Sequence, residues 1–134
     1  MKDALFSIVP IGTIGKDSSV PSIVVAERFR PTLLELDGFS HLIVLWWSDC
    51  YPDGSELMKM GECLSAPTDY SNGWAMGIFA TRSPVRPNPI CLSVVRINSI
   101  DPEKRTIRVS GIDAFPGSPV LDAKPYYPCL DRAR

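Results

Sequence analysis

Two arginines stand in a segment with little backbone freedom, Ala80-Thr81-Arg82-Ser83-Pro84-Val85-Arg86-Pro87-Asn88-Pro89. Each of its prolines fixes its own φ at about −65°, and Ser83, Arg86 and Asn88 each precede a proline, which disfavours the α region. A guanidinium group can donate two parallel hydrogen bonds to a carboxylate or a phosphate. Holding Arg82 and Arg86 in place before binding lowers the entropy lost on contact. The segment is predicted to bind a small anionic or polar ligand; the alternative is a stiff connector with solvated arginines.

A second candidate for chemistry is the pair Asp122 and Lys124. Their spacing places both side chains on one face of a strand, where they can interact. We consider two roles, alignment of a catalytic site and an ion pair that closes one end of the fold.

The length of 134 residues is that of one domain, predicted over residues 1–134. No apolar run approaches the roughly 20 residues of a membrane helix, and no signal-peptide pattern opens the chain, so we expect a soluble cytoplasmic protein. With four irregularly spaced cysteines and a single histidine, free thiols and no metal site are expected. The net charge is −1, but residues 1–74 hold 5 Lys/Arg against 10 Asp/Glu, and residues 75–134 hold 9 against 5. A basic surface in the second half is one interpretation of this asymmetry and solvated strand faces are the other.

Short apolar and β-branched runs, separated by many prolines and glycines, predict an all-β fold. Between them, residues 31–36 are expected to form one helical turn, residues 101–105 a hairpin-like turn, and the acidic residues 48–73 one long loop with a short helix near 55–64. Six or seven strands in a chain of this size suggest a small closed or nearly closed antiparallel β-barrel, because closure removes exposed strand edges. Strands are expected at 5–14, 23–29, 40–47, 74–80, 90–100 and 106–112, and around Asp122 and Lys124.

Three segments, residues 36–42, 77–90 and 117–126, closely resemble the signature segments of the TsaA/TrmO family. The resemblance implies a β-barrel, a homodimer with the cofactor site near its interface, and S-adenosyl-L-methionine as cofactor. It also implies the activity of a methyltransferase that modifies the exocyclic nitrogen of threonylcarbamoyl-adenosine, beside the anticodon of threonine tRNAs. Transfer RNA is thus the expected partner.

Carried over one position at a time, the resemblance assigns a cofactor contact to Arg82 of the Ala-Thr-Arg-Ser motif. It assigns a second contact to Leu92, for which core packing is the alternative. The tight turn before the Asp-x-Lys-Pro-Tyr element falls on Gly117, Ser118 and Pro119, where backbone amides can meet polar cofactor groups. The remaining predicted cofactor contacts are Arg86 and Asn88 of the proline-rich segment.

The chain departs from the family pattern at several positions. Ser48 and Asp49 stand where the family usually has a histidine with a polar neighbour, which makes Asp49 a candidate substitute base. Asp122 and Lys124 complete the predicted catalytic residues. An expected acidic residue is Pro116 here, and an expected glycine is Cys91.

Two other functions stay open on this sequence. One is a methyltransferase that acts on a small molecule, with residues 48–73 as a lid, which fits the computed pI of about 5.8 better. The other is a barrel that binds S-adenosyl-L-methionine without catalysis, which the missing family histidine suggests.

Overall fold

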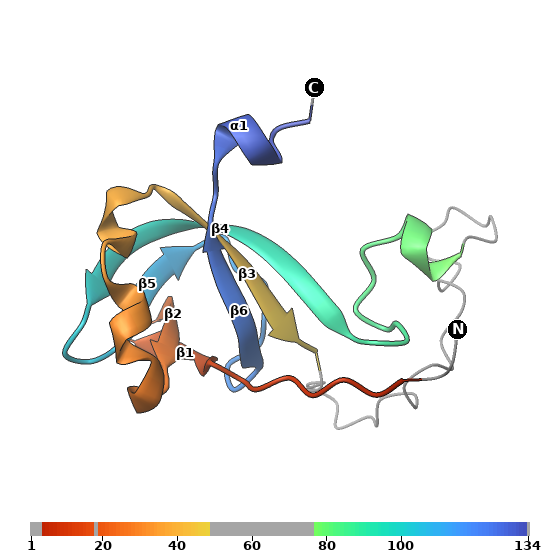
Figure 1. Cartoon of the computed structure of the whole chain (residues 1–134), viewed down its shortest axis with the longest axis horizontal. Coiled ribbons are helices and arrows are strands. Elements are labelled where there is room, and N and C mark those ends of the chain that lie inside the picture. The colour runs from red at the N-terminus through yellow and green to blue at the C-terminus, as the bar shows by residue number, and fades with distance from the viewer. Residues whose placement is uncertain (1–3, 18, 49–76, 134) are drawn as a thin grey trace.

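Six strands form a closed antiparallel barrel in the order β1-β2-β5-β4-β3-β6 (Figure 1). The structure is a computed structural model that describes residues 4–17, 19–48 and 77–133. The all-β prediction and the barrel are confirmed. The strands are β1 (Gly12–Asp17), β2 (Val20–Val25), β3 (His41–Trp47), β4 (Ile90–Asp101), β5 (Thr106–Ser110) and β6 (Pro119–Pro125).

The described helices are short. Three are 3-10 helices, η1 (Glu27–Leu33), η2 (Leu36–Gly38) and η4 (Ile78–Ala80), and the fourth is α1 (Pro128–Asp131). The helical turn predicted at residues 31–36 lies at the end of η1 and the start of η2. Pro31 is accommodated because a short 3-10 helix has few hydrogen bonds to lose.

The core follows from alternation along the strands. On β3, Leu42, Val44 and Trp46 are at most 6% exposed, while the residues between them face outward and are half-buried. Val95, Ile107, Val109 and Val120 meet them from the neighbouring strands. Because successive strand residues point to opposite faces, each strand supplies every second side chain to the barrel interior.

The prediction for the first strand was wrong over residues 5–11. Pairing begins at Gly12, which lies opposite Val25, and continues to Asp17, three residues beyond the predicted end of the strand. The apolar residues from Leu5 to Val9 are exposed, Leu5 completely, whereas Ile11 packs against the barrel core. Gly12 permits the close approach of β1 and β2, since a Cβ atom there would overlap the carbonyl oxygen of Val24.

Two other strand boundaries differ from prediction. β2 ends at Val25, where η1 takes over residues expected to extend the strand to 29. Residues 78–80, predicted as the end of a strand, form η4, so the arginine segment joins a 3-10 helix to β4 rather than two strands. Residues 74–76 and most of the long loop predicted at 48–73 lie outside the described residues.

The strand β4 extends beyond one of its partners. Residues 90–96 pair with β3, whereas pairing with β5 begins only at Arg96, opposite Ser110. Residues 90–95 therefore have one edge without a strand partner in the described part of the chain. An open edge presents backbone groups that other parts of the protein can bind, and the candidate site lies there.

Candidate functional site

The proline-rich segment packs along the open edge of β4. Arg82 donates a hydrogen bond from Nη2 to the carbonyl oxygen of Leu92, at 2.9 Å. That carbonyl points away from β3, so the arginine occupies the position that a β5 residue would otherwise take. At the end of the segment, the amide of Ser48 donates to the carbonyl of Pro89. The segment is thus attached to the barrel at both ends of its course.

Hydrogen bonds inside the segment support the predicted rigidity. The Thr81 hydroxyl donates to the carbonyl of Ile78 at 2.8 Å and accepts from the amide of Ser83. Arg86 donates from Nη1 to the carbonyls of Ser83, at 2.8 Å, and Thr81, at 3.2 Å. These bonds to described residues use Nη2 of Arg82 and Nη1 of Arg86, so the other nitrogens of each guanidinium remain able to bind an anion.

The opposite wall comes from the chain that follows β5. Gly111 has φ +92°, which only glycine adopts without strain, and it turns the chain away from the sheet. Two residues later, Asp113 accepts a hydrogen bond on Oδ1 from the Ser93 hydroxyl, at 2.9 Å. Ser93 in turn accepts from Trp46 Nε1 at 3.0 Å. Trp46 and Ser93 are both 6% exposed, so this carboxylate is anchored to the barrel interior.

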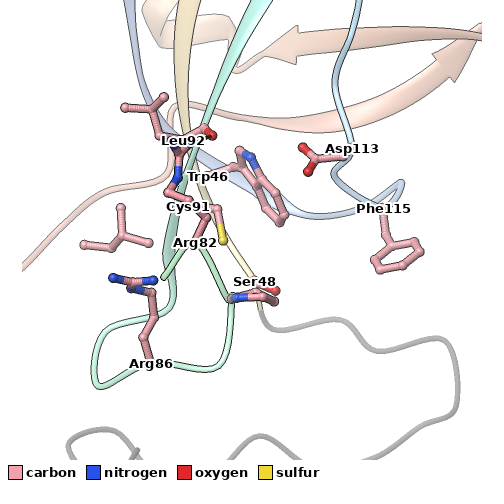
Figure 2. Close-up of a pocket in the computed structure, with 10 residues that line it drawn as sticks. Trp46, Ser48, Arg82, Arg86, Cys91, Leu92, Asp113 and Phe115 are labelled. Carbon is pink, nitrogen blue, oxygen red and sulfur yellow. Dashed lines mark hydrogen bonds between the residues drawn. The ribbon is translucent and has the colours of Figure 1, made fainter. Parts of the chain in front are cut away.

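Between the two walls lies a cavity of about 300 Å³ (Figure 2). This volume is at the lower end of the range, roughly 300–1,000 Å³, found for small-molecule sites. One end is cationic, with two arginines, and the other holds a carboxylate. The lining residues are Trp46, Ser48, Arg82, Pro84, Arg86, Ile90, Cys91, Leu92, Asp113 and Phe115.

The Cys91 thiol lies inside this cavity, between groups of opposite charge. Burial raises its pKa and the Asp113 carboxylate raises it further, whereas Arg86, Arg82 and a hydrogen bond with Ser48 act in the other direction. Cys91 is therefore a neutral thiol near pH 7. Charged groups on both walls act on the Cys91 thiol, so its reactivity reports a change of charge at either wall.

The structure brings three of the predicted cofactor contacts together. Arg82, Arg86 and Leu92 all line the cavity, and Leu92 is 41% exposed on the outer face of β4, so its alternative role in core packing is wrong. Asn88 and Pro119 instead line a second, more apolar cavity of about 610 Å³, beside residues 4–10 and Trp47.

The turn before β6 is formed differently from the prediction. The amide of Gly117 donates to the carbonyl of Ile14 at 2.7 Å, and that of Ser118 donates to Phe115 at 3.1 Å. Both amides therefore stabilise the fold instead of presenting free donors to a ligand. The Ser118 side chain is 1% exposed, and its hydroxyl has no hydrogen-bond partner among the described residues.

Asp122 and Lys124 form an ion pair, with Lys124 Nζ 2.8 Å from Asp122 Oδ2. They lie on the outer face of β6, partly exposed, and line neither cavity. The hydrogen bond with Asp122 raises the pKa of Lys124, so its ammonium does not act as a base near neutral pH. Asp49, the other predicted base, lies outside the described residues.

The sequence interpretation missed Asp113. It was not singled out because it lies neither in the proline-rich segment nor in the element that contains Asp122 and Lys124. A signal was present in Gly111-Ile112-Asp113, because a glycine directly after a strand marks the point where the chain can turn. Its link to Ser93 and Trp46 joins residues 20 and 47 positions apart, which no local pattern reveals.

The arginines of the second half have different surroundings. Arg82 and Arg86 line the cavity, Arg96 lies on the outer face of β4, and Arg105 pairs with Glu27 at 3.0 Å.

Among residues 4–17, 19–48 and 77–133, no three His, Cys, Asp or Glu side chains are placed to hold a metal ion together. No helix in these ranges has the length and apolar character needed to cross a bilayer. Cys91 and Cys129 are free thiols, as predicted, while Cys50 and Cys63 lie outside the described residues.

Comparison with known proteins gives a consistent result. A crystal structure of TrmO from Pseudomonas aeruginosa matches with a TM-score of 0.71 and 26% identity, over 97% of this chain and 60% of that one. A probable S-adenosyl-L-methionine-binding protein of Methanothermobacter thermautotrophicus is 36% identical over 145 residues, which covers 98% of this chain and 97% of the relative. A tRNA (adenine(37)-N6)-methyltransferase of Eikenella corrodens is 47% identical over 57 residues, 42% of this chain and 32% of the relative.

The chain thus spans about three fifths of the TrmO chain whose crystal structure it matches. The sequence model of the tRNA-methyltransferase O N-terminal domain matches residues 7–132, nearly the whole chain. With the closed barrel and the arginine segment in place, the resemblance drawn from the sequence is confirmed: this chain belongs to the tRNA-methyltransferase O N-terminal domain family.

Proposed function

We propose that this chain is an S-adenosyl-L-methionine-dependent methyltransferase that binds its cofactor in the cavity beside β4. The observation that carries the proposal is the pair of guanidinium groups, Arg82 and Arg86, held by backbone carbonyls at one end of that cavity. The support from relatives is that several are named as S-adenosyl-L-methionine-binding proteins.

The residues present fit the chemical groups of this cofactor. Its amino-acid carboxylate suits two fixed guanidinium groups, and Trp46, Ile90 and Leu92 offer apolar walls. When bound, S-adenosyl-L-methionine supplies an electrophilic methyl group on a sulfonium. Arg82 and Arg86 bind and orient the carboxylate of the cofactor. We expect most of the rate acceleration to come from placement of the methyl group beside the acceptor and from the exclusion of water.

The finer part of the proposal is the acceptor. We infer that it is the exocyclic nitrogen of an adenine in tRNA, with threonylcarbamoyl-adenosine as the specific substrate. The support is the description of the family and the name of the Eikenella relative. With tRNA as the acceptor, we also propose a cytoplasmic location.

The acceptor is tested with tRNA from cells that lack this methylation. After incubation with the protein and S-adenosyl-L-methionine, mass spectrometry of the digested nucleosides is expected to show a new species one methyl group heavier than threonylcarbamoyl-adenosine. Methylation of metabolites but not of tRNA would select a small-molecule enzyme. Tight cofactor binding with no methylated product from tRNA or cell extract would select a non-catalytic barrel.

We also propose that two copies pair through the outer face of β3 and β4. Three side chains of β4 alternate outward along this face and are 39%, 41% and 47% exposed: Ile90, Leu92 and Val94. Opposite them on β3 are Trp47, Leu45 and Ile43. Six neighbouring apolar side chains on an outer surface are typical of an interface. The face adjoins the cavity, since Ile90 and Leu92 belong to both.

A further inference from the structure

The anchored carboxylate at the other end of the cavity has no assigned role. We propose that Asp113 is the catalytic base of this site, which takes the proton from the acceptor nitrogen during methyl transfer. The inference rests on the proposed function, because it assumes a nitrogen acceptor and a sulfonium donor.

The geometry around the Asp113 carboxylate suits a base. The hydrogen bonds from Trp46 to Ser93 and from Ser93 to Asp113 hold Oδ1 in place at 3.0 and 2.9 Å. Oδ2 makes no hydrogen bond to the described residues, although the carboxylate lines the cavity. Figure 2 shows Asp113 and Arg86 on opposite sides of Trp46 and Cys91. One oxygen is therefore fixed while the other is available to a ligand, as a base requires.

The change of charge during methyl transfer indicates which reactant faces Asp113. During the transfer, positive charge leaves sulfur and develops on the acceptor nitrogen. A carboxylate beside sulfur would stabilise the starting state more than the transition state, whereas one beside nitrogen does the opposite. The arginines occupy the other end, where the amino-acid carboxylate binds. Asp113 thus belongs on the acceptor side.

The acceptor nitrogen is a weak nucleophile while it keeps its proton. The lone pair of a carbamoylated exocyclic nitrogen is delocalised, so loss of its proton makes it a better nucleophile. Asp113 Oδ2 takes that proton as the carbon–nitrogen bond forms and the carbon–sulfur bond breaks, with the bonding pair left on sulfur as a neutral thioether. The proton then passes to solvent, which regenerates the carboxylate.

The experiment compares Asp113→Asn with the native protein in single-turnover methyl transfer to tRNA that carries threonylcarbamoyl-adenosine. We expect a loss in rate of about 100-fold or more, as for removal of a general base. The affinity for S-adenosylhomocysteine, measured by calorimetry, should change by less than about threefold, because a base on the acceptor side does not contact the cofactor carboxylate.

One further measurement tests where the Asp113 carboxylate lies. Without activity as the readout, Cys91 should react faster with iodoacetamide in Asp113→Asn, because a charge that raises its thiol pKa has been removed.

The matched control is Asp37→Asn, an exposed carboxylate in η2 that does not line the cavity, which should change none of these values. A tenfold or greater loss of S-adenosylhomocysteine affinity in Asp113→Asn at an unchanged rate would make Asp113 a cofactor contact and overturn the proposal. An unchanged rate would overturn it as well. If the native protein methylates no acceptor, the proposed function fails instead, which is a distinguishable result.

Discussion

Arg82→Met is expected to weaken binding of S-adenosylhomocysteine by about 10- to 100-fold, as measured by calorimetry. The substitution keeps a long apolar side chain but removes charged hydrogen bonds, each worth about 1.5–3 kcal/mol. Arg82 is exposed and bonds only to the carbonyl of Leu92 among the described residues, so the melting temperature should change little. The affinity of Arg82→Lys for S-adenosylhomocysteine should lie between those of the native protein and Arg82→Met, because lysine keeps the charge and loses the planar pair of donors.

The control for this prediction is Arg96→Met. Arg96 is an exposed arginine on the outer face of β4 and does not line the cavity, so the affinity should be that of the native protein. Affinity that is retained in Arg82→Met would place the cofactor elsewhere. Arg86 is a less clean probe, because it also holds the segment together through the carbonyls of Thr81 and Ser83.

Val94→Glu is expected to convert the protein from dimer to monomer. Val94 is 47% exposed on the apolar outer face, and a two-fold interface would bring two new carboxylates into an apolar contact. Sedimentation should show the native protein at twice the chain mass of 14.8 kDa, and the variant at once that mass.

The control for the dimer is Ser99→Glu, an exposed position farther along β4 and outside the apolar face, which should stay dimeric. A native protein that sediments as a monomer in the upper micromolar range would contradict the proposed interface. A dimer that tolerates Val94→Glu would locate the interface on a different surface.

The fold was largely predictable because its signals are local. The strand predicted at residues 40–47 is observed at His41–Trp47, and that predicted at 90–100 is observed at Ile90–Asp101. The first strand was misplaced because residues 5–11 have the apolar character of a core strand, although Leu5, Phe6, Ile8 and Val9 are exposed. What decides its start is the approach of Gly12 to Val24, a contact between backbones that periodicity does not encode.

The candidate site was predictable only on one side. The proline-rich segment carries its rigidity in its own sequence, and the structure places Arg82 and Arg86 at a cavity. The opposite wall depends on where β5 ends and on the hydrogen bond from Ser93 to Asp113. Only the closed fold defines these two features. For Asp122 and Lys124, the spacing predicts that the two side chains pair, but it does not predict that they lie away from both cavities.

The most direct test of the account is protection of the Cys91 thiol. Cys91 lies inside the cavity between the arginine segment and Asp113. We predict that saturating S-adenosylhomocysteine slows its alkylation by iodoacetamide at least about tenfold, followed by mass spectrometry of the Cys91 peptide, while exposed Cys129 reacts at an unchanged rate. Equal alkylation of Cys91 with and without bound S-adenosylhomocysteine would contradict the placement of the cofactor in this cavity.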